Sequence, residues 1–299
     1  MEFGSHLVFK YVVPIFLGLM VLEFIFAKHH YNLKETASSL TIATVSTFIA
    51  VFTKAVAFGI FIVVFEASEP LRVQLLGYSS LGWAWYVWLF ALIADDFNFY
   101  WHHRLSHTVR LLWAFHIPHH NANTFNLSVS LRNGWFITLY KPIYWLWLPL
   151  IGVEPVMVAA CLLINGVYQL FLHSQLVPSL GFFEKVFNSP YLHRVHHSCN
   201  PGYLDKNHGG VLIIWDKLFG TFQDVIPSIK PKYGVLKGPD TLNPVTANTH
   251  EFQNIWRDVR GANCWADRIK YIFWPPGWSP NGSLRTARVL NREFHEQRQ

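Results

Sequence analysis

Residues 75–107 read LLGYSSLGWAWYVWLFALIADDFNFYWHHRLSH, and this stretch decides the fold. Residues 75–94 carry no charge, and a helix of about 20 apolar residues can cross the hydrocarbon core of a bilayer. No Gly or Pro interrupts residues 95–107, so the helix is predicted to continue through them. His103 and His107 then lie on one helical face, because residues four apart share a face.

Other apolar runs occupy residues 8–27 and 40–65, and a pair at 135–152 and 155–173 is interrupted by prolines and predicts a helical hairpin. Hydrophobic residues make up 52% of the chain and charged residues 14%. Trp and Tyr crowd the ends of the runs, as in an interfacial belt. We expect an all-α, multi-pass membrane protein of about four to five membrane helices with a cytosolic histidine-rich cap. Five buried helices of a large soluble protein are the alternative.

Loop charge predicts the topology. The loop at 28–39 carries two lysines, and the loop at 66–74 is mainly acidic. The positive-inside rule places the first loop in the cytoplasm and the second on the opposite side. Residues 8–27 are then an anchor rather than a cleaved signal, and the N-terminus faces away from the cytoplasm. Residues 95–134 and the C-terminal third face the cytoplasm.

Histidines supply the chemistry of the predicted site. Of the 16 histidines, eight form the clusters His103-x-x-x-His107, His116-x-x-His119-His120 and His193-x-x-His196-His197. Each cluster can aim two or three neutral imidazoles at one point, which suits iron, zinc or copper. Asp96, two helical turns before His103, is predicted to accept an imidazole N–H and fix its tautomer; a charged helix end at headgroup level is the alternative. Pro118 predicts that a helix begins there, because proline is tolerated in a first turn.

Several other classes of protein are not favoured. The three cysteines have no Cys-x-x-Cys spacing, so neither a disulfide framework nor a thiolate zinc site is expected. No run of like charge suggests nucleic-acid binding. No His-Glu-x-x-His protease motif or Gly-x-Gly-x-x-Gly dinucleotide fingerprint occurs. Residues 252–273 show helical spacing of apolar side chains, which fits a helix lying on the membrane and equally one packed on the cap.

The motifs YWHHRLSH (100–107), HIPHH (116–120) and HRVHH (193–197), with the tail Asn207-His208-Gly209-Gly210 and WDKLFGT (215–221), resemble the fatty acid hydroxylase/sterol desaturase superfamily of membrane di-iron oxygenases. FNLSVSLR (125–132) and LDKNHGGVLIIWDKLFGTF (204–222) resemble its alkylglycerol monooxygenase branch. The family often has a tyrosine where this chain has His208. That leaves open whether His208 adds a ligand or is a polar replacement.

The resemblance implies two non-haem iron ions. The implied ligands are His103, His107, His116, His119, His120, His193, His196 and His197, with His173 as a further candidate whose alternative is an interfacial histidine, and with Asp96, Asn207 and His208 around them. It also implies hydroxylation or desaturation of a lipid C–H bond with O₂ and external electrons, the lipid being an ether lipid, a sterol or a fatty acyl chain. No fused haem motif His-Pro-Gly-Gly occurs, so we expect a separate donor: a reduced pterin, or a protein of the cytochrome b5 or ferredoxin type.

The predicted organisation follows from these motifs. Residues 1–94 hold N-terminal transmembrane helices, residues 95–225 hold the catalytic domain with its membrane hairpin at 135–173, and residues 226–299 form a cytosolic or membrane-surface tail. The expected location is a bacterial inner membrane or the endoplasmic reticulum, with the active site on the cytoplasmic face. A histidine-rich metal transporter, or a non-catalytic metal-binding membrane protein, is the alternative; transporters place polar ligands near the bilayer midplane.

Overall fold

The computed structural model describes residues 8–239 and 242–298. All regular secondary structure within those ranges is helical, and no β-strand forms there. The α-helices are α2 (Val13–Phe26), α3 (Leu33–Leu76), α4 (Trp85–Thr108), α5 (Arg110–His120), α6 (Trp147–Leu150), α7 (Pro155–Phe171), α8 (Pro190–His196), α9 (Ile214–Leu218), α10 (Pro244–Gly261), α11 (Trp265–Phe273) and α12 (Ala287–Glu296). Short turns are η1 (Val8–Val12), η2 (Lys28–His30), η3 (Leu127–Leu131), η4 (Ile137–Leu139), η5 (Lys141–Trp145) and η6 (Gly181–Lys185). The predicted all-α class is confirmed.

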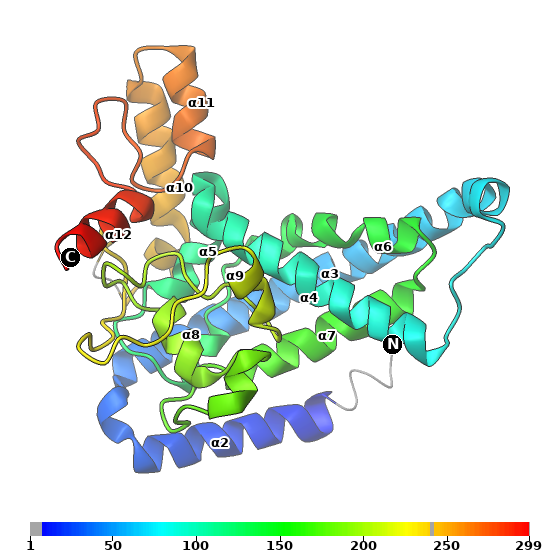
Figure 1. The fold of residues 1–299 in the computed structure, drawn as a ribbon, viewed down its shortest axis with the longest axis horizontal. Coiled ribbons are helices and arrows are strands. Elements are labelled where there is room, and N and C mark those ends of the chain that lie inside the picture. Colours follow the sequence, from blue (N-terminus) through cyan, green and yellow to red (C-terminus); the bar gives the residue numbers. More distant parts are fainter. Residues whose placement is uncertain (1–7, 240–241, 299) are drawn as a thin grey trace.

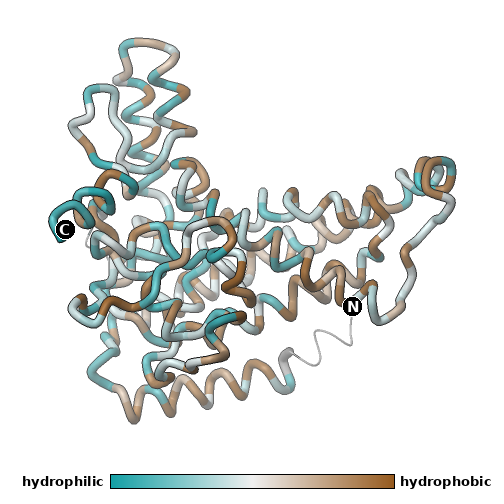
Figure 2. Tube along the Cα trace, in the orientation of Figure 1, coloured by the Kyte–Doolittle hydropathy of each residue, from teal (hydrophilic) through white to brown (hydrophobic). Residues whose placement is uncertain are grey.

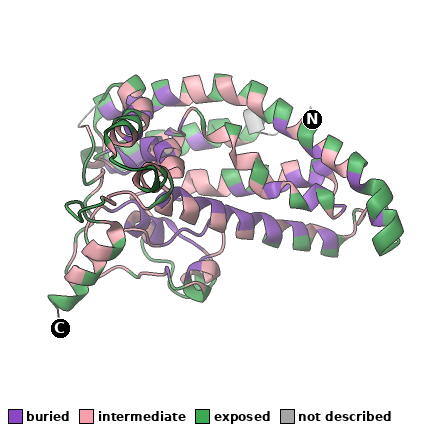
Figure 3. Cartoon of the chain, turned by 90° about the horizontal axis from the view of Figure 1, so that it is seen from above, coloured by how far each residue is buried: buried purple, intermediate pink, exposed green. Residues whose placement is uncertain are grey.

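The long helices α3, α4 and α7 run in one general direction, with α2 beside them, and the short helices gather at one end (Figure 1). The chain passes repeatedly between the two ends. The turn at 27–32, the end of α4 and the end of α7 lie at the end with the short helices, whereas the loop at 77–84 lies at the other end. Buried residues are concentrated near the short helices, and the long helices show many exposed and half-buried positions (Figure 3).

Helix α3 is, among the described residues, the one helix long and apolar enough to cross a membrane by length and composition. Its surface is apolar yet exposed: Phe48 is 69% exposed, Val56 63% and Val63 63%. Figure 2 shows hydrophobic colour recurring along the long helices. Exposed apolar surface of this extent is typical of contact with lipid or with a partner. The number of crossings stays a prediction.

The two loops predicted beside α3 differ from the structure: the loop at 28–39 is shorter than expected, and the prediction of a loop at 66–74 is wrong. Asn32 caps the helix by accepting hydrogen bonds from the amides of Lys34 and Glu35, so most of 28–39 is helical. Residues 66–74 lie inside α3 rather than in a loop. Their charges are compatible with the helix, because Glu66 and Glu69 are exposed and the guanidinium of the buried Arg72 donates to the carbonyls of Ser79, Pro149 and Leu150. Gly77, in the left-handed region at φ 76°, ends the helix.

Helix α4 starts later than predicted but reaches the first histidine cluster. Gly77 and Gly82, with φ of 76° and 74°, form the turn that delays its start to Trp85. It then runs without a break to Thr108, which confirms that one helix carries His103 and His107.

The predicted helix start at Pro118 is wrong, because α5 begins at Arg110 and contains Pro118 in its last turn. Proline has no backbone N–H, so Pro118 cannot donate to the carbonyl four residues before it, and the helix ends two residues later. The Pro118 carbonyl is not left bare, because it accepts a hydrogen bond of 2.9 Å from Nε of Arg132.

The core joins three of the long helices beneath the histidine-rich end. Buried side chains from α3, α4, the η5–α6 segment and α7 form one cluster: Phe61, Val87, Ala91, Ala94, Phe99, Trp145, Leu148, Val153, Met157, Val158 and Cys161. On the opposite side α10 packs against α5, where Arg110 contacts Glu251 at 2.8 Å and Asp258 at 2.7 Å. These contacts hold α5, which carries the second histidine cluster, between the core and α10.

The positions of the loops at the two ends of the long helices predict from which side of a membrane each loop can be labelled. Ser79, in the loop at 77–84, and Ser283, near the C-terminus, lie at opposite ends of the long helices and are both exposed. Ser79→Cys and Ser283→Cys, each made in a Cys264→Ser background because Cys264 is exposed, should react with a membrane-impermeant maleimide from opposite sides. Ser283→Cys should react from the cytoplasmic side. Reaction of both from one side would contradict an odd number of crossings between them.

Candidate metal centre

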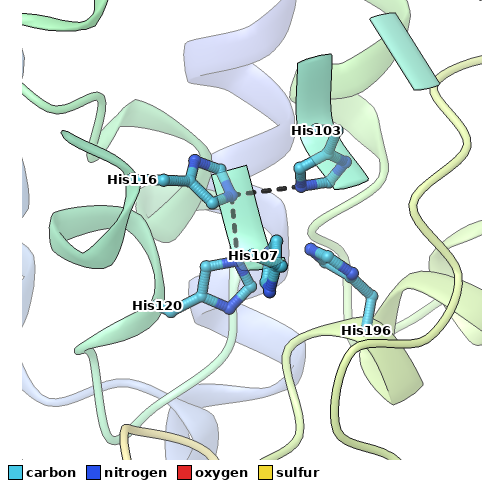
Figure 4. Close-up of side chains that lie close together, drawn as sticks. All are labelled: His103, His107, His116, His120 and His196. Atoms are coloured by element: carbon cyan, nitrogen blue, oxygen red, sulfur yellow. Dashed lines mark hydrogen bonds between the residues drawn. The ribbon is translucent and has the colours of Figure 1, made fainter. Parts of the chain in front are cut away.

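All nine predicted candidate ligands lie in two adjacent groups. The five-histidine group is His103, His107, His116, His120 and His196 (Figure 4). The four-histidine group is His119, His173, His193 and His197. Within each group, one candidate ligand atom per residue lies within 4.8 Å of all the others. Two of the three clusters are divided between the groups, which the spacing alone did not predict.

Helical periodicity explains this division. On α5, His116 and His120 are four residues apart and share a face, whereas His119 is displaced around the helix and points to the other group. On α8, His193 and the capping residue His197 form the equivalent pair, and His196 turns to the five-histidine group. Two short helices therefore bridge the groups.

The ring nitrogens converge at ligand spacing. In the five-histidine group, Nε2 of His116 lies 3.1 Å from Nε2 of both His103 and His120. In the four-histidine group, Nε2 of His173 lies 3.1 Å from Nε2 of His119 and His197 and 3.2 Å from that of His193. Two nitrogens that are each about 2.1 Å from one metal ion are separated by about 3.0 to 3.4 Å for angles of about 90° to 109°.

Hydrogen bonding between the rings accounts for only part of this packing. Nδ1 of His103 lies 2.8 Å from the His208 carbonyl, and Nδ1 of His173 lies 3.1 Å from the Gln169 carbonyl. A carbonyl accepts only, so in a neutral ring the proton is on Nδ1 and Nε2 is a bare lone pair. Nε2 atoms of His173, His193 and His197 stand 3.1 to 3.2 Å apart in a triangle. Each of these atoms carries either one proton or one lone pair, so the three contacts cannot all be hydrogen bonds, whereas a shared cation satisfies all three.

Burial keeps the rings in the form that binds metal. Burial, followed by the influence of neighbouring imidazoles, holds the pKa of His120, His196 and His197 well below the ordinary value. The same causes lower the pKa of His116 and His193. A metal-binding imidazole must be neutral. The donor set is therefore nitrogen-only and uncharged, which fits iron and equally zinc.

A loop at 205–208 supports the five-histidine group from behind. The Lys206 carbonyl accepts from Nδ1 of His196 at 2.8 Å, as the His208 carbonyl does from His103, and the Asp205 carboxylate lies 3.4 Å from Nδ1 of His107. Asp205 and Asn207 have φ of 52° and 56°, a region that L-residues rarely adopt. This strained backbone turns the carbonyls toward the imidazoles, which fixes ring orientation.

Asn207, one of the residues predicted to surround the metals, holds this loop rather than touching a histidine. Its amide donates to the carbonyls of Leu192 and Gln223 at 3.1 and 2.8 Å, and its side-chain oxygen accepts from the Gln223 amide at 2.9 Å. Asn207 therefore ties the loop to α8 and to the segment after α9.

The predicted contact of Asp96 with an imidazole is wrong. Its carboxylate instead accepts from the backbone amides of Val211 and Leu212, at 2.7 and 2.9 Å, and from the Trp215 indole at 2.9 Å. A Cβ at Gly210 would meet Asp96 Oδ1 at 2.8 Å, so glycine allows this close approach. Asp96 therefore acts on the site through the backbone that carries the 205–208 loop.

His208 contributes its backbone, and the ring stays apart. The ring is 1% exposed and its centroid lies 5.0 Å from that of His107. Neither ring nitrogen has a hydrogen-bond partner within the described chain, although the Asp205 carbonyl lies near the ring. The ring borders the five-histidine group without joining it.

Sequence analysis missed two carboxylates that hold the site from the N-terminal helices. Glu35 of α3 accepts from the amides of Asn123 and Thr124, at 2.9 and 3.0 Å, just after the second cluster. Glu23 of α2 is 1% exposed. It accepts four hydrogen bonds of 2.6 to 2.8 Å, from Tyr31, Leu127, Ser174 and Gln175. For Glu23 the available signal was a lone acidic residue in an apolar run, because a buried carboxylate requires partners; Glu35, beside Lys34 in a polar stretch, gave no such signal.

The fold and the site define an all-helical protein with two adjacent groups of converging histidines. Residues 88–221 match the profile of the fatty acid hydroxylase family. The chain is 32% identical to the human alkylglycerol monooxygenase over 280 residues, which are 91% of this chain and 60% of that protein. It is 35% identical to the Xenopus tropicalis enzyme of that name over 198 residues, 66% of this chain and 43% of that protein.

An ornithine lipid hydroxylase of Rhizobium tropici is 30% identical over 175 residues, 52% of this chain and 51% of that protein. These similarities support the fatty acid hydroxylase superfamily, and within it the alkylglycerol monooxygenase branch, as the relatives of this chain. It spans about 60% of the length of the human relative. No solved structure matches it significantly.

The two groups predict a graded loss of metal. Protein purified from iron-replete, anaerobic cells should hold two ions per chain. His107→Ala should lose the ion of the five-histidine group, and His197→Ala that of the four-histidine group, because each removes a convergent ligand. His250→Ala is the control, since His250 is buried but outside both groups, and it should keep both ions. Elemental analysis and far-ultraviolet circular dichroism would check this, and unchanged metal in His107→Ala would remove that residue from the ligand set.

Asp96→Asn should weaken metal binding without removing a ligand. In the variant, the side-chain amide of residue 96 points an N–H group at a backbone N–H of 211–212 that donates to a carboxylate oxygen in the wild type. The two donors repel, so we expect the backbone at 211–212 to shift and the 205–208 loop to shift with it. Loss of such support typically weakens metal binding about 10- to 100-fold. Release of iron to a chelator would measure it. Glu66→Gln, at an exposed carboxylate on α3, is the matched control, and equal release from both variants would show that Asp96 does not support the site.

Proposed function

We propose that this chain is a membrane-bound di-iron enzyme that uses O₂ and external electrons to hydroxylate a C–H bond of a lipid, with desaturation as the alternative outcome. The observation that carries the proposal is the convergence of nine imidazoles into two adjacent groups that share two of the histidine clusters. The names of the relatives, monooxygenase and hydroxylase, support it.

Iron is proposed over zinc on chemical grounds. Imidazole suits both metals, but zinc has no redox chemistry. Bound iron would supply the reductive activation of O₂ that a C–H oxidation requires. The five-histidine group would hold one ion, and the four-histidine group would hold the other with one protein ligand fewer.

The chain's own residues bind and orient the metals and exclude water. The carbonyls of Gln169, Lys206 and His208 hold Nδ1 protons and so keep the opposite nitrogens free. Phe125 stacks on the His173 ring at 5.4 Å, and the Trp113 ring lies 5.1 Å from that of His107. Aromatic walls of this kind keep water from a reactive site.

The proposed substrate is an aliphatic lipid. An apolar groove of about 250 Å³ lies between α3 and the η4–η5 segment, and its lining includes Phe52, Val56, Ile60, Leu139, Ile143 and Leu146. It adjoins Tyr140, whose hydroxyl lies 3.2 Å from both His102 and Ser106 of α4. An alkyl chain fits such a lining. The name alkylglycerol monooxygenase favours an ether lipid, and we propose that the carbon attacked lies near the headgroup, such as one next to an ether oxygen; a sterol or a fatty acyl chain is the alternative.

The membrane placement is part of the proposal. Residues 1–94 would supply transmembrane helices, 95–225 the catalytic domain with the 135–173 hairpin, and 226–299 a surface region. The histidine groups would lie at the cytoplasmic face of a bacterial inner membrane or of the endoplasmic reticulum. The electron donor would be separate, either a reduced pterin or a protein of the cytochrome b5 or ferredoxin type.

A metal transporter is the second candidate, and the position of the histidines weighs against it. Transport sites lie near the bilayer midplane, often on broken helices. Here both groups draw on the short helices α5 and α8, which gather at one end of the molecule.

Lipidomics under ¹⁸O₂ tests the function. Cells that express the chain with an active donor should accumulate a lipid that has gained one ¹⁸O atom or lost two hydrogens. His120→Ala should abolish this product, whereas His250→Ala should retain it. If no lipid changes in this way while the purified chain holds iron, the chain is not a lipid oxygenase.

A further inference from the structure

Helix α11 carries an apolar stripe that the rest of the described chain leaves uncovered. Trp265, Ile269 and Phe273 are 75%, 52% and 53% exposed. They are spaced four residues apart, so they form one line along the helix. No residue of α11 is buried. Large apolar side chains that are exposed next to one another typically mark an interaction surface.

The stripe is held on a rigid support. Helix α10, which precedes α11, packs on α5 through the Arg110 ion pairs and through Phe252, whose ring lies 4.9 Å from that of Phe115. The Arg110 amide also donates to the Trp274 carbonyl at 3.1 Å, which fixes the far end of α11. The α10–α11 hairpin therefore packs in part on the cap, as one interpretation of the sequence expected, but the face of α11 that carries the stripe stays uncovered.

Basic side chains accompany the stripe. The guanidinium of Arg268 lies 4.9 Å from the Trp265 ring centroid, and that of Arg260 lies 5.8 Å from the Trp256 ring centroid. Lys270 adds a third positive charge, and Asp258 is already paired with Arg110. Tryptophan and aliphatic side chains beside arginine and lysine match the headgroup region of an anionic leaflet, where the rings enter the boundary and the cations meet phosphates.

The hairpin is also placed where such a leaflet would be. It projects sideways from the histidine-rich end, across the direction of the long helices, and α11 lies on the side of α10 toward which those helices extend (Figure 1). If the long helices cross a bilayer, the hairpin runs along its surface.

We propose that α11 lies in the headgroup region of an anionic leaflet through Trp265, Ile269 and Phe273, and that it sets the depth of the histidine groups relative to the membrane. The proposal rests on the proposed membrane placement of the long helices and not on the oxidative chemistry. It commits to lipid as the occupant of the stripe, rather than to a donor protein or a second copy of the chain.

Spin-label accessibility in nanodiscs that hold one full-length chain tests the proposal. The background is Cys199→Ser with Cys264→Ser, and Cys161 is buried. A nitroxide at Ile269→Cys is compared with one at Asp267→Cys, which lies on the opposite face of the helix. In nanodiscs of phosphatidylcholine with phosphatidylglycerol, the accessibility ratio of O₂ to an aqueous nickel chelate should be several-fold higher at position 269. Arg268→Glu with Lys270→Glu should lower that ratio in anionic discs and have little effect in phosphatidylcholine alone.

Equal, high access of the nickel chelate at both positions would overturn the proposal. Protection at 269 that appears only with two chains per disc would assign the stripe to a second copy, and protection only on adding a donor protein would assign it to that partner; both outcomes overturn the lipid assignment. A nitroxide at Phe48→Cys on α3 separates the two hypotheses. An O₂-accessible label at 48 with a water-exposed label at 269 means that the membrane placement holds and the hairpin proposal fails.

Discussion

Imidazole nitrogens packed about one hydrogen-bond length apart in a buried interior are the constraint on which this structure depends. Nε2 atoms of His173, His193 and His197 stand within 3.2 Å of one another. Each carries either one proton or one lone pair, so at least one of the three contacts is repulsive unless a cation lies between them. Burial lowers the pKa of the rings and so prevents protonation from relieving the repulsion. The arrangement is therefore stable only with metal, or because the surrounding protein holds it.

The surrounding protein holds it from three directions. Asp96 on α4 binds the backbone at 211–212 behind the five-histidine group. Glu23 and Glu35, on α2 and α3, bind the segments that follow His173 and the second cluster. These carboxylates replace the water that loop amides would otherwise require, because a buried amide without a partner is costly. The N-terminal helices thus brace the site in addition to any role in the membrane.

How far the sequence predicts this arrangement depends on the range of the interaction. The helix through His103 and His107 follows from local periodicity, and so does the presence of a metal-binding constellation. The predicted helix start at Pro118 was wrong because the preference of proline for a first turn is a local tendency, whereas the packing of α5 against α4 and α10 keeps the helix intact through Pro118. The prediction of a loop at 66–74 was wrong because the charged Arg72 is accommodated in a helix by hydrogen bonds to carbonyls of the α6 region. A local sequence pattern cannot reveal partners so far away along the chain.

The sequence by itself determined that the chain is helical, that its long helices are apolar and that its histidines come in three clusters at ligand spacing, because these are properties of neighbouring residues. Only the tertiary structure decided how the clusters divide into groups of five and four, that His173 joins the smaller group, and that Asp96 acts through a loop instead of an imidazole. Each of these depends on contacts between segments tens of residues apart, whose geometry is set by packing and hydrogen bonding and not by local pattern.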